Sequence, residues 1–305
     1  MPGNVCKIND NNSPNVELIK EKLSSWGVDD FTLQYFLRGL LLKNKICTVE
    51  AFEHNELVGL LTSWRTDFHP FCTYFSIVSK PHIGFGIEDA LLEFLSERKE
   101  IQYPLQTSIW ESSYRLKLFF EENGFVEIRR TYSPLLKTSR IDCRQAFPDI
   151  IMEDYSIKDL QSAAKNPELK LKLICLVKEN YEISHFANPV GEHGLEKWEQ
   201  LIFDEDTILQ GSFVVLKDNE ILAYALLHSS DNPNHFEFGW RGTKANTDVR
   251  FMLWLTAYQI NYAVEKGVNS IEAEIDTTDE SALEMLKFFP FSPAPTLITF
   301  QKFEE

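Results

Sequence analysis

The chain has 305 residues, of which 44% are hydrophobic, 13% aromatic and 25% charged, so it is long enough for two domains with large cores. Its formal net charge of −16, without a Lys/Arg-rich run, argues against nucleic acid or an anionic membrane as the main partner. No apolar stretch reaches the roughly 18 residues of a membrane span, and the N-terminus lacks an apolar signal segment, so a cytoplasmic protein is expected.

The cysteines are scattered and odd in number, and they form neither a CxxC motif nor a Cys/His cluster. This pattern predicts reduced, mostly buried thiols and no metal site, with a catalytic cysteine as the minor alternative. The five are Cys6, Cys47, Cys72, Cys143 and Cys175.

The first half of the chain predicts helices and strands in a mixed order. Ser13 and Pro14 have the pattern of a helix start, and His54-Asn55 has the pattern of a hairpin turn. The expected helices are 14–27, 29–42, 85–98 and 112–122, and the expected strands are 46–53, 57–64, 71–79, 104–110 and 125–135.

Residues 137–150 lose hydrophobic periodicity, which predicts a linker. The second half again predicts a hairpin, which turns at Asp218-Asn219. Its expected helices are 168–181, 194–203, 247–266 and 279–288, and its expected strands are 212–217, 220–228, 235–241, 269–275 and 296–302.

The two halves repeat each other. Asn55-Glu56 and Asn219-Glu220 occupy the same place in two similar hairpin patterns, at an offset of 164 residues. An internal duplication follows, with domains over 1–136 and 153–305 joined by a linker over 137–152. The order of elements predicts an α/β fold of the α+β type, in which each domain has a mixed, mostly antiparallel sheet flanked by helices.

A glycine pair follows the third strand of the first half. Gly84 and Gly86 lie between that strand and an amphipathic helix, an arrangement that lets backbone N–H groups approach a phosphate at the helix N-terminus. An ordinary loop with two turn glycines explains the pair equally well.

In this context the first half resembles the GNAT superfamily of acyl-CoA N-acyltransferases. The glycine turn is one sequence landmark of that family. A second landmark aligns with Ser113, Leu116 and Phe120 and then with Gly124-Phe125, and only the Gly-Phe pair has the family's usual residues. The resemblance implies that acetyl-CoA lies beside the third strand and the glycine turn, and that the first half is the better cofactor site. The residues implied for it are Val78, Ile83, Gly84, Phe85, Gly86 and Ile87.

The second half resembles the C-terminal domain of tandem, mycothiol-synthase-like GNAT proteins. The phosphate-binding turn that the resemblance implies for this half, residues 247–251, contains no glycine. The carboxylate of Asp248 in that turn would repel the negative charge of a diphosphate. The positions that match the family pattern are Tyr181, His185, Asn188, Pro189, Trp240, Gly242 and Thr243.

The implied activity is acetyl transfer from acetyl-CoA to a primary amine by direct attack, without a metal. Glu237 and His185 are the candidate bases that would take the proton from the amine. A solvent-facing strand residue and a structural histidine are the respective alternatives. The family's usual tyrosine acid is replaced by Phe120 and Leu286 in the two halves.

The acceptor is a small-molecule or peptide amine that the sequence does not specify further, and no residue pattern indicates an oligomeric state. A non-catalytic CoA-binding sensor or scaffold of the same fold is the alternative, because both cofactor motifs are degenerate. A Fem-type aminoacyl transferase is the third possibility, disfavoured by the charge of −16.

Overall fold

The computed structural model describes residues 7–11, 13–81 and 85–304. Its contacts divide the chain into two compact units, neither of which is continuous in sequence. The first unit comprises the residues up to Ile128, then Ala187–Gly191 and the residues from Leu297 onward. The second comprises Arg129–Phe186 and Glu192–Thr296.

The repeated hairpins are confirmed. In the first, β2 (Lys45–Glu53) pairs with β3 (Glu56–Trp64), and in the second, β9 (Phe213–Lys217) pairs with β10 (Glu220–Ser229). The two turn residues have positive φ in both cases: 48° and 65° in the first turn, 50° and 63° in the second. Two consecutive positive φ values define a type I′ turn, whose twist suits a tight hairpin.

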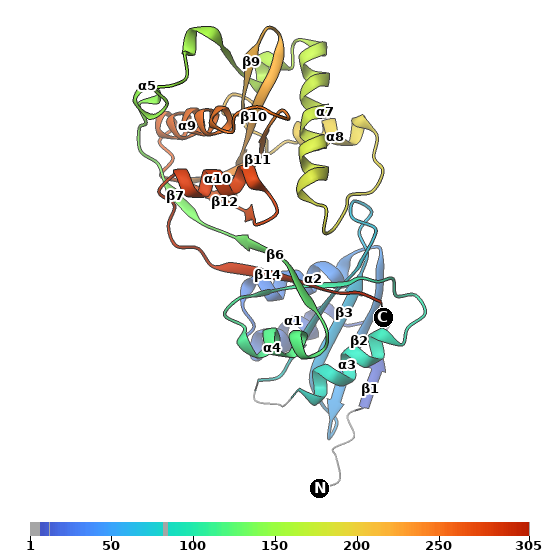
Figure 1. Cartoon of the computed structure of the whole chain (residues 1–305). Helices are drawn as coiled ribbons and strands as arrows, with labels where there is room; N and C mark the ends of the chain where they lie inside the picture. The colour runs from blue at the N-terminus through green and yellow to red at the C-terminus, as the bar shows by residue number, and fades with distance from the viewer. Residues whose placement is uncertain (1–6, 12, 82–84, 305) are drawn as a thin grey trace. The chain divides into compact units, whose positions relative to one another are not determined.

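The first sheet has eight strands in the order β1-β2-β3-β4-β5-β14-β6-β13. Strands β4 and β5 are parallel, whereas β1–β2, β2–β3, β3–β4, β5–β14 and β6–β13 are antiparallel pairs. Figure 1 shows the C-terminal strand β14, drawn in red, among strands from the blue and green part of the chain. The bounds not yet given are β1 (Lys7–Asp10), β4 (Thr73–Ser79), β5 (Leu105–Trp110), β6 (Val126–Tyr132), β13 (Ile275–Asp276) and β14 (Thr296–Lys302).

The second sheet has six strands in the order β7-β12-β11-β10-β9-β8. Here β11 and β12 form the parallel pair, and the other pairs are antiparallel. Both sheets are therefore mixed and mostly antiparallel, as the sequence predicts. The remaining bounds are β7 (Leu135–Lys137), β8 (Ser156–Asp159), β11 (His235–Thr243) and β12 (Ser270–Ala273).

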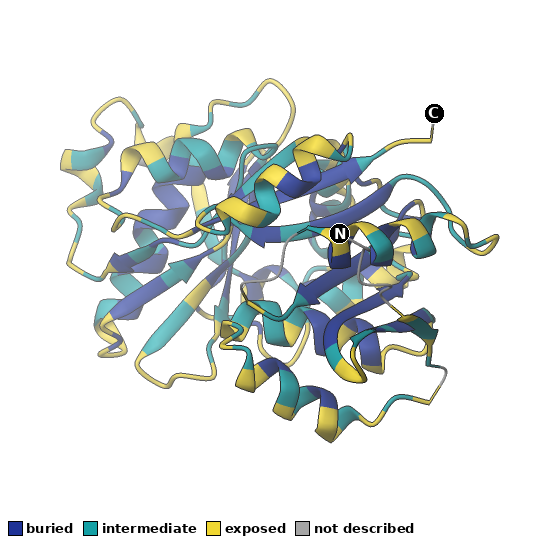
Figure 2. Cartoon of the chain, turned by 90° about the horizontal axis from the view of Figure 1, so that it is seen from below, coloured by how far each residue is buried: buried dark blue, intermediate teal, exposed yellow. Residues whose placement is uncertain are grey.

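Helices flank each sheet, and Figure 2 shows that many of them have exposed outer faces while the strands are largely buried. Several helices begin where the sequence offers an Asn or Asp cap, as at Asn15, Asp29 and Asn166, whose side chains accept bonds from the first-turn amides. The bounds are α1 (Val16–Ser25), α2 (Asp30–Leu41), α3 (Gly86–Ser96), α4 (Tyr114–Glu122), α5 (Cys143–Ala146), η1 (Met152–Asp154), α6 (Leu160–Ala163), α7 (Pro167–Ser184), α8 (Leu195–Ile202), α9 (Arg250–Glu265) and α10 (Glu280–Phe288).

The last strands of the two halves are exchanged, which the sequence pattern does not predict. Strand β14, expected in the second half, pairs with β5 of the first sheet over six residue pairs. The single strand expected over 125–135 is two strands, because Pro134 has no N–H for a ladder bond. Beyond this break, β7 pairs with β12 in the second sheet. The predicted ranges 1–136 and 153–305 follow the repeat, whereas the compact units follow this exchange.

The segment predicted as a linker is partly structured. Asp142 caps the short helix α5 by accepting bonds from the amides of Arg144 and Gln145. Phe147 of this segment is buried in the core of the second unit, as is Leu136 just before it, together with residues of β9 to β12, α9 and α10. The linker is therefore held to the second unit by apolar contacts that its irregular sequence pattern conceals.

Each unit has its own core. In the first, side chains of β2 to β5, α3 and α4 pack together with Ile298 and Phe300 of β14, and a smaller cluster joins α1 and α2 to the sheet. Across the part of the chain that the structure describes, no helix combines the length and apolar character needed to cross a bilayer.

We predict that replacing Phe300 by alanine destabilises the first unit. Phe300 is 1% exposed and its ring lies tilted against that of Phe120, with centroids 5.9 Å apart, so the change leaves a cavity that lowers the free energy of unfolding by about 3–5 kcal/mol. Phe303→Ala is the control, since that side chain is 55% exposed. Urea unfolding measures the loss, and hydrogen exchange locates it. Loss of amide protection confined to β9–β12, with β5 unchanged, would contradict the exchanged strand.

Candidate functional site

The second sheet opens where its parallel pair separates. The register of β11 with β12 runs from His235–Ser270 to Phe238–Ala273 and ends there, whereas β11 continues to Thr243 beside β10. The β10–β11 register shifts by one residue: Ala225 pairs with Arg241 and Leu227 pairs with Phe238, so two residues of β11 lie opposite one residue of β10. This is a β-bulge at Gly239–Trp240. A bulge leaves a backbone group without its hydrogen bond in the sheet and changes the direction in which the next side chain points.

A pocket of about 430 Å³ lies at this opening, and all the residues that line it belong to the second unit. We call it the α7–α10 pocket, because the end of α7, the end of β11 with the loop after it, and the first turn of α10 form its walls. Its lining residues are Glu179, Asn180, Tyr181, Ile183, Ser184, His185, Phe186, Tyr224, Trp240, Arg241, Thr243, Lys244, Ala245, Asn246, Thr278, Asp279, Glu280 and Ser281.

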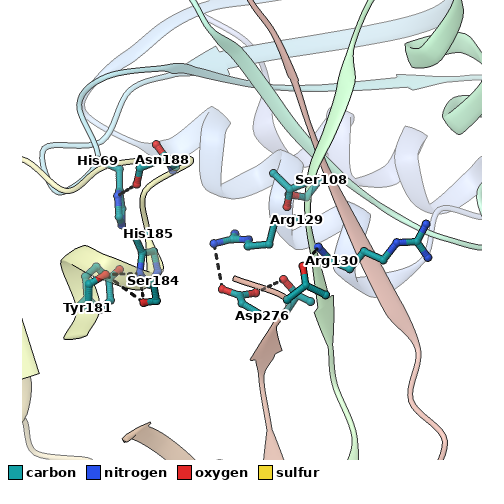
Figure 3. Close-up of polar contacts among 12 residues, drawn as sticks. His69, Ser108, Arg129, Arg130, Tyr181, Ser184, His185, Asn188 and Asp276 are labelled. Carbon is teal, nitrogen blue, oxygen red and sulfur yellow. Dashed lines mark hydrogen bonds and ion pairs between the residues drawn. The ribbon is translucent and has the colours of Figure 1, made fainter. Parts of the chain in front are cut away.

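The end of α7 holds His185 in a defined orientation. Its Nδ1 lies 2.9 Å from the carbonyl oxygen of Tyr181 and 3.0 Å from the hydroxyl of Ser184, as Figure 3 shows. A carbonyl oxygen can only accept, so Nδ1 carries a proton and the neutral ring has its basic lone pair on Nε2. The ring also stacks on Tyr181 with centroids 3.7 Å apart and an interplanar angle of 10°.

Aromatic rings extend this wall of the pocket. Tyr181 contacts Trp240 edge-on at 5.0 Å and Trp198 at 5.3 Å. Trp198 is fully buried, so it supports the cluster from behind, whereas Trp240 lines the pocket beside the bulge. Burial raises the pKa of the Tyr181 hydroxyl, and also that of Tyr224, above the ordinary value for tyrosine.

A buried cation and a half-buried carboxylate also line the pocket. Arg241 is only 5% exposed, and its guanidinium donates to the carbonyl of Gly239 and to the hydroxyl of Thr256. Burial lowers the pKa of Arg241 and raises the pKa of Asp279. The attraction between the two charges acts against both shifts: Asp279 raises the pKa of Arg241, and Arg241 lowers the pKa of Asp279. Asp279 also caps α10 by accepting a bond from the amide of Ala282.

The two candidate bases lie in different places. His185 lines the α7–α10 pocket, whereas Glu237 is exposed near the start of β11, opposite His228 and Glu272 in the ladders, and is not among the lining residues. Asn188, which follows His185 in the same sequence motif, belongs to the first unit, where its side-chain amide donates to the hydroxyl of Tyr74 at 2.7 Å.

The residues predicted for the cofactor surround the start of α3 in the first unit. Val78 and Ile87 are buried and belong to apolar clusters, and Phe85 precedes the helix and packs on Phe119. Gly86 begins the helix, and the space around its missing Cβ is open. The two others, Ile83 and Gly84, lie outside the described residues.

A buried carboxylate lies in the first turn of the same helix. Glu88 is fully buried and accepts hydrogen bonds from Ser79 and from Arg115, whose guanidinium also covers the ring of Phe85 at 4.9 Å. The nearby cation is therefore already paired with a carboxylate of the protein itself. A diphosphate at this helix N-terminus would meet that carboxylate and would have to compete for Arg115.

The equivalent helix of the second unit, α9, is arranged in a similar way. Asp248 accepts from the amide of Arg250 at 2.9 Å, and its carboxylate also pairs with the Arg250 guanidinium, which lies 2.9 Å from Asp149 as well. Both Asp248 and Arg250 side chains are partly exposed, at 41% and 48%. The sequence predicts that Asp248 is unfavourable for phosphate binding. In the structure its carboxylate instead binds the backbone amide and the guanidinium of Arg250.

Sequence reasoning finds part of this pocket. Tyr181, His185, Trp240 and Thr243 come from the resemblance, and all four line the pocket. The bulge and the buried Arg241 are missed, because neither alternation nor spacing marks a register shift within a strand. Within the described ranges, no group of three or more His, Cys, Asp or Glu side chains is placed to hold a metal ion.

No sequence-family model matches the chain, and no curated protein matches it either. Solved structures do. A GCN5-related N-acetyltransferase from Sphaerobacter thermophilus superposes with a TM-score of 0.63 at 14% identity, over 99% of this chain and 96% of that one. A tandem GNAT protein from the clavulanic acid biosynthesis pathway gives a TM-score of 0.54 at 12% identity, over 98% of each chain.

A further match is a GCN5-related glucosamine N-acetyltransferase region of a fungal multi-domain GH3 β-N-acetylglucosaminidase, with a TM-score of 0.65 and 12% identity. It covers 99% of this chain but 38% of that one. At such identities the similarity is one of fold. The chain therefore has the fold of two tandem GCN5-related N-acetyltransferase (GNAT) domains.

Proposed function

We propose that the protein is an acyl-CoA-dependent N-acyltransferase that transfers an acetyl group to a primary amine, and that the reaction takes place in the α7–α10 pocket. The observation that carries the proposal is the coincidence of three features in the second unit. The parallel strands separate there, β11 is bulged there, and His185 faces the same pocket. In the first unit the parallel pairing of β4 with β5 also ends early, at Tyr74–Gln106, but the register between β3 and β4 runs without a shift from Gly59 to Trp64, so the difference between the units is the bulge.

His185 is the base that the geometry favours. An alkyl amine has a pKa of about 10 and must lose a proton before it attacks a thioester. The hydrogen bond from Nδ1 to the Tyr181 carbonyl fixes the tautomer in which Nε2 accepts that proton. The backbone group freed by the bulge and the positive charge of the buried Arg241 favour negative charge developing on the acyl oxygen.

The fit of an acyl-CoA to this site differs between its two ends. The pocket has room and polar groups for the acyl end, with Thr278 and Ser281 on one wall and Asn246 on another. The phosphate end meets the Asp248–Arg250 pair instead of a glycine turn. We therefore propose that affinity comes mainly from the acyl and thioester arm, and that the diphosphate contributes less than a glycine cradle would give.

Direct attack on the donor fits the thiols of this chain. Burial raises the pKa of Cys47 and Cys143, and raises that of Cys72 to about 12. Thiols of this kind stay protonated at neutral pH and are poor nucleophiles. Of the cysteines expected to be mostly buried, Cys47 and Cys72 are buried, Cys143 is half-buried and Cys175 is exposed, while Cys6 lies outside the described residues. Cys175 lies on α7 outside the lining of the pocket.

A non-catalytic CoA-binding or scaffold protein is the second candidate. The observation in its favour is that both helix N-termini expected to face a diphosphate have a side-chain carboxylate, Glu88 in the first unit and Asp248 in the second. Binding of acetyl-CoA without turnover on a panel of amines supports a sensor, and absence of binding supports a scaffold.

We predict that blocking the α7–α10 pocket weakens acetyl-CoA binding, whereas a substitution in the glycine turn at the start of α3 does not. Ser281→Phe adds a ring at a half-buried position of the pocket wall, and the dissociation constant should rise at least about tenfold, which corresponds to roughly 1.4 kcal/mol. Gly86→Asp, in the open space at the start of α3, should leave it within about twofold. Isothermal titration calorimetry measures both.

The same two variants test the sequence-based assignment. If Gly86→Asp weakens binding and Ser281→Phe does not, the cofactor lies in the first half, as the glycine pair predicts. The thermal midpoints of both variants must match the wild type for the comparison to count.

The two candidate bases can be compared directly. His185→Gln should lower kcat by about 10²–10⁴ with little change in the KM for acetyl-CoA, since a base acts on the amine. Glu237→Gln, on the exposed part of β11, should leave kcat nearly unchanged. Steady-state kinetics with an amine that the wild type accepts gives the comparison. The reverse pattern would transfer the base role to Glu237.

We expect the rate to rise with pH up to at least 10, following deprotonation of the amine. The tyrosines that line the pocket, Tyr181 and Tyr224, have raised pKa values, so they keep their protons through this range. A tyrosine with an ordinary pKa acting as the acid would instead make the rate fall near pH 9–10. A pH–rate profile with such a fall, or ping-pong kinetics, would contradict the proposed mechanism.

A further inference from the structure

We propose that a second pocket in the second unit, lined by residues at and beside β8, β9 and α9, binds a small organic cation of the quaternary ammonium type. Its volume is about 440 Å³, and its lining residues are Tyr155, Ile157, Asp159, Phe213, Trp254 and Tyr258. We call it the aromatic pocket. It shares no lining residue with the α7–α10 pocket, so the inference stands independently of the proposed acyl transfer.

The backbone explains why these side chains meet. Ile157 and Asp159 are two residues apart on β8, so they lie on the same face of the sheet, and Asp159 is paired with Phe213 of β9. Helix α9 packs against β9, and its Trp254 and Tyr258 are four residues apart, so they lie on one face of the helix.

The rings stand at steep angles to one another. Tyr155 and Trp254 make an angle of 76°, Trp254 and Tyr258 make 82°, and Phe213 and Tyr258 make 65°. Their centroids lie 6.5, 5.8 and 5.9 Å apart in the same order. Trp254 is 1% exposed and belongs to the core, whereas Tyr155, Phe213 and Tyr258 are partly exposed, so these three rings are the ones that can present negative π faces to a cation.

The charges at the pocket favour a cation over a neutral apolar ligand. Asp159 provides a carboxylate in the lining, and its side chain also caps α6 through the amide of Ser162. Lys217 places its Nζ 5.3 Å from the centroid of the Tyr155 ring, so one face of this ring is already covered by an ammonium group whose charge opposes a second cation, and the attraction must come from Asp159 and the other ring faces. The net charge of −16 raises the local concentration of cations around the chain.

A quaternary ammonium ion suits this pocket better than a metal ion or a primary amine. It is large and weakly hydrated, so it gains from several ring faces at once and needs no hydrogen-bond acceptors. An inorganic cation would need several oxygen ligands, whereas Asp159 is the only carboxylate among the lining residues.

Choline is the probe, and 3,3-dimethylbutan-1-ol is its matched control, because it has the same shape with carbon in place of the charged nitrogen. Calorimetric titration of the full chain at constant ionic strength should give a dissociation constant for choline at least about tenfold lower than for the neutral alcohol. Asp159→Asn, which keeps the helix cap, should weaken choline binding about five- to tenfold.

Tyr258→Leu removes one wall of the aromatic pocket and should weaken choline binding at least about threefold. Tyr262→Leu, one turn further along α9 and outside the pocket, is its control and should leave binding unchanged. Thermal midpoints show whether each variant is folded. Equal binding of choline and the neutral alcohol, no binding of choline, or equal affinities of wild type, Asp159→Asn and Tyr258→Leu would each overturn the proposal.

Discussion

The end of the parallel pairing between β11 and β12 is the constraint on which the rest of the site depends. Beyond Phe238 and Ala273 the two strands no longer share hydrogen bonds, so the sheet opens and β11 has one edge without a partner strand there. The bulge at Gly239–Trp240 lies at the start of this opening. The glycine gives room for a neighbouring side chain, because a Cβ at Gly239 would lie 2.1 Å from the present position of the His228 ring. The helices α7 and α10 then supply the remaining walls of the pocket.

The internal repeat gives the two halves the same elements but not the same chemistry. In the first unit, the carboxylate of Glu88 takes the cation that a phosphate would need, and β4 keeps a regular register with β3. In the second unit, the pocket has a histidine whose Nδ1 contacts a backbone carbonyl, a bulged strand and a buried arginine. The first unit also differs in receiving a strand from the other half of the chain. Its strand β14, contributed by the end of the chain, is buried within the first sheet.

The sequence predicts local features well, because the physical causes lie within a few residues. Asn219 and Asn55 mark two hairpins that both adopt type I′ turns, and Asn166 marks the start of α7. It does not predict which sheet the last strand of each half joins, because β14 is equally suited to either sheet by its alternation of side chains. The resemblance places His185 at the site, but the carboxylate of Glu88 and the cation of Arg241 become meaningful only through contacts with residues far away in sequence.

Hydrogen–deuterium exchange with and without acetyl-CoA tests the central claim, the location of the acyl-transfer site in the second unit, most directly. The expected result is slower exchange at the end of β11 and in the loop after it, residues 240–246, and in the first turn of α10, residues 279–283. The amides around the start of α3, residues 85–90, should exchange at the same rate in both conditions. Protection at α3 together with unchanged exchange at 240–246 would contradict the account.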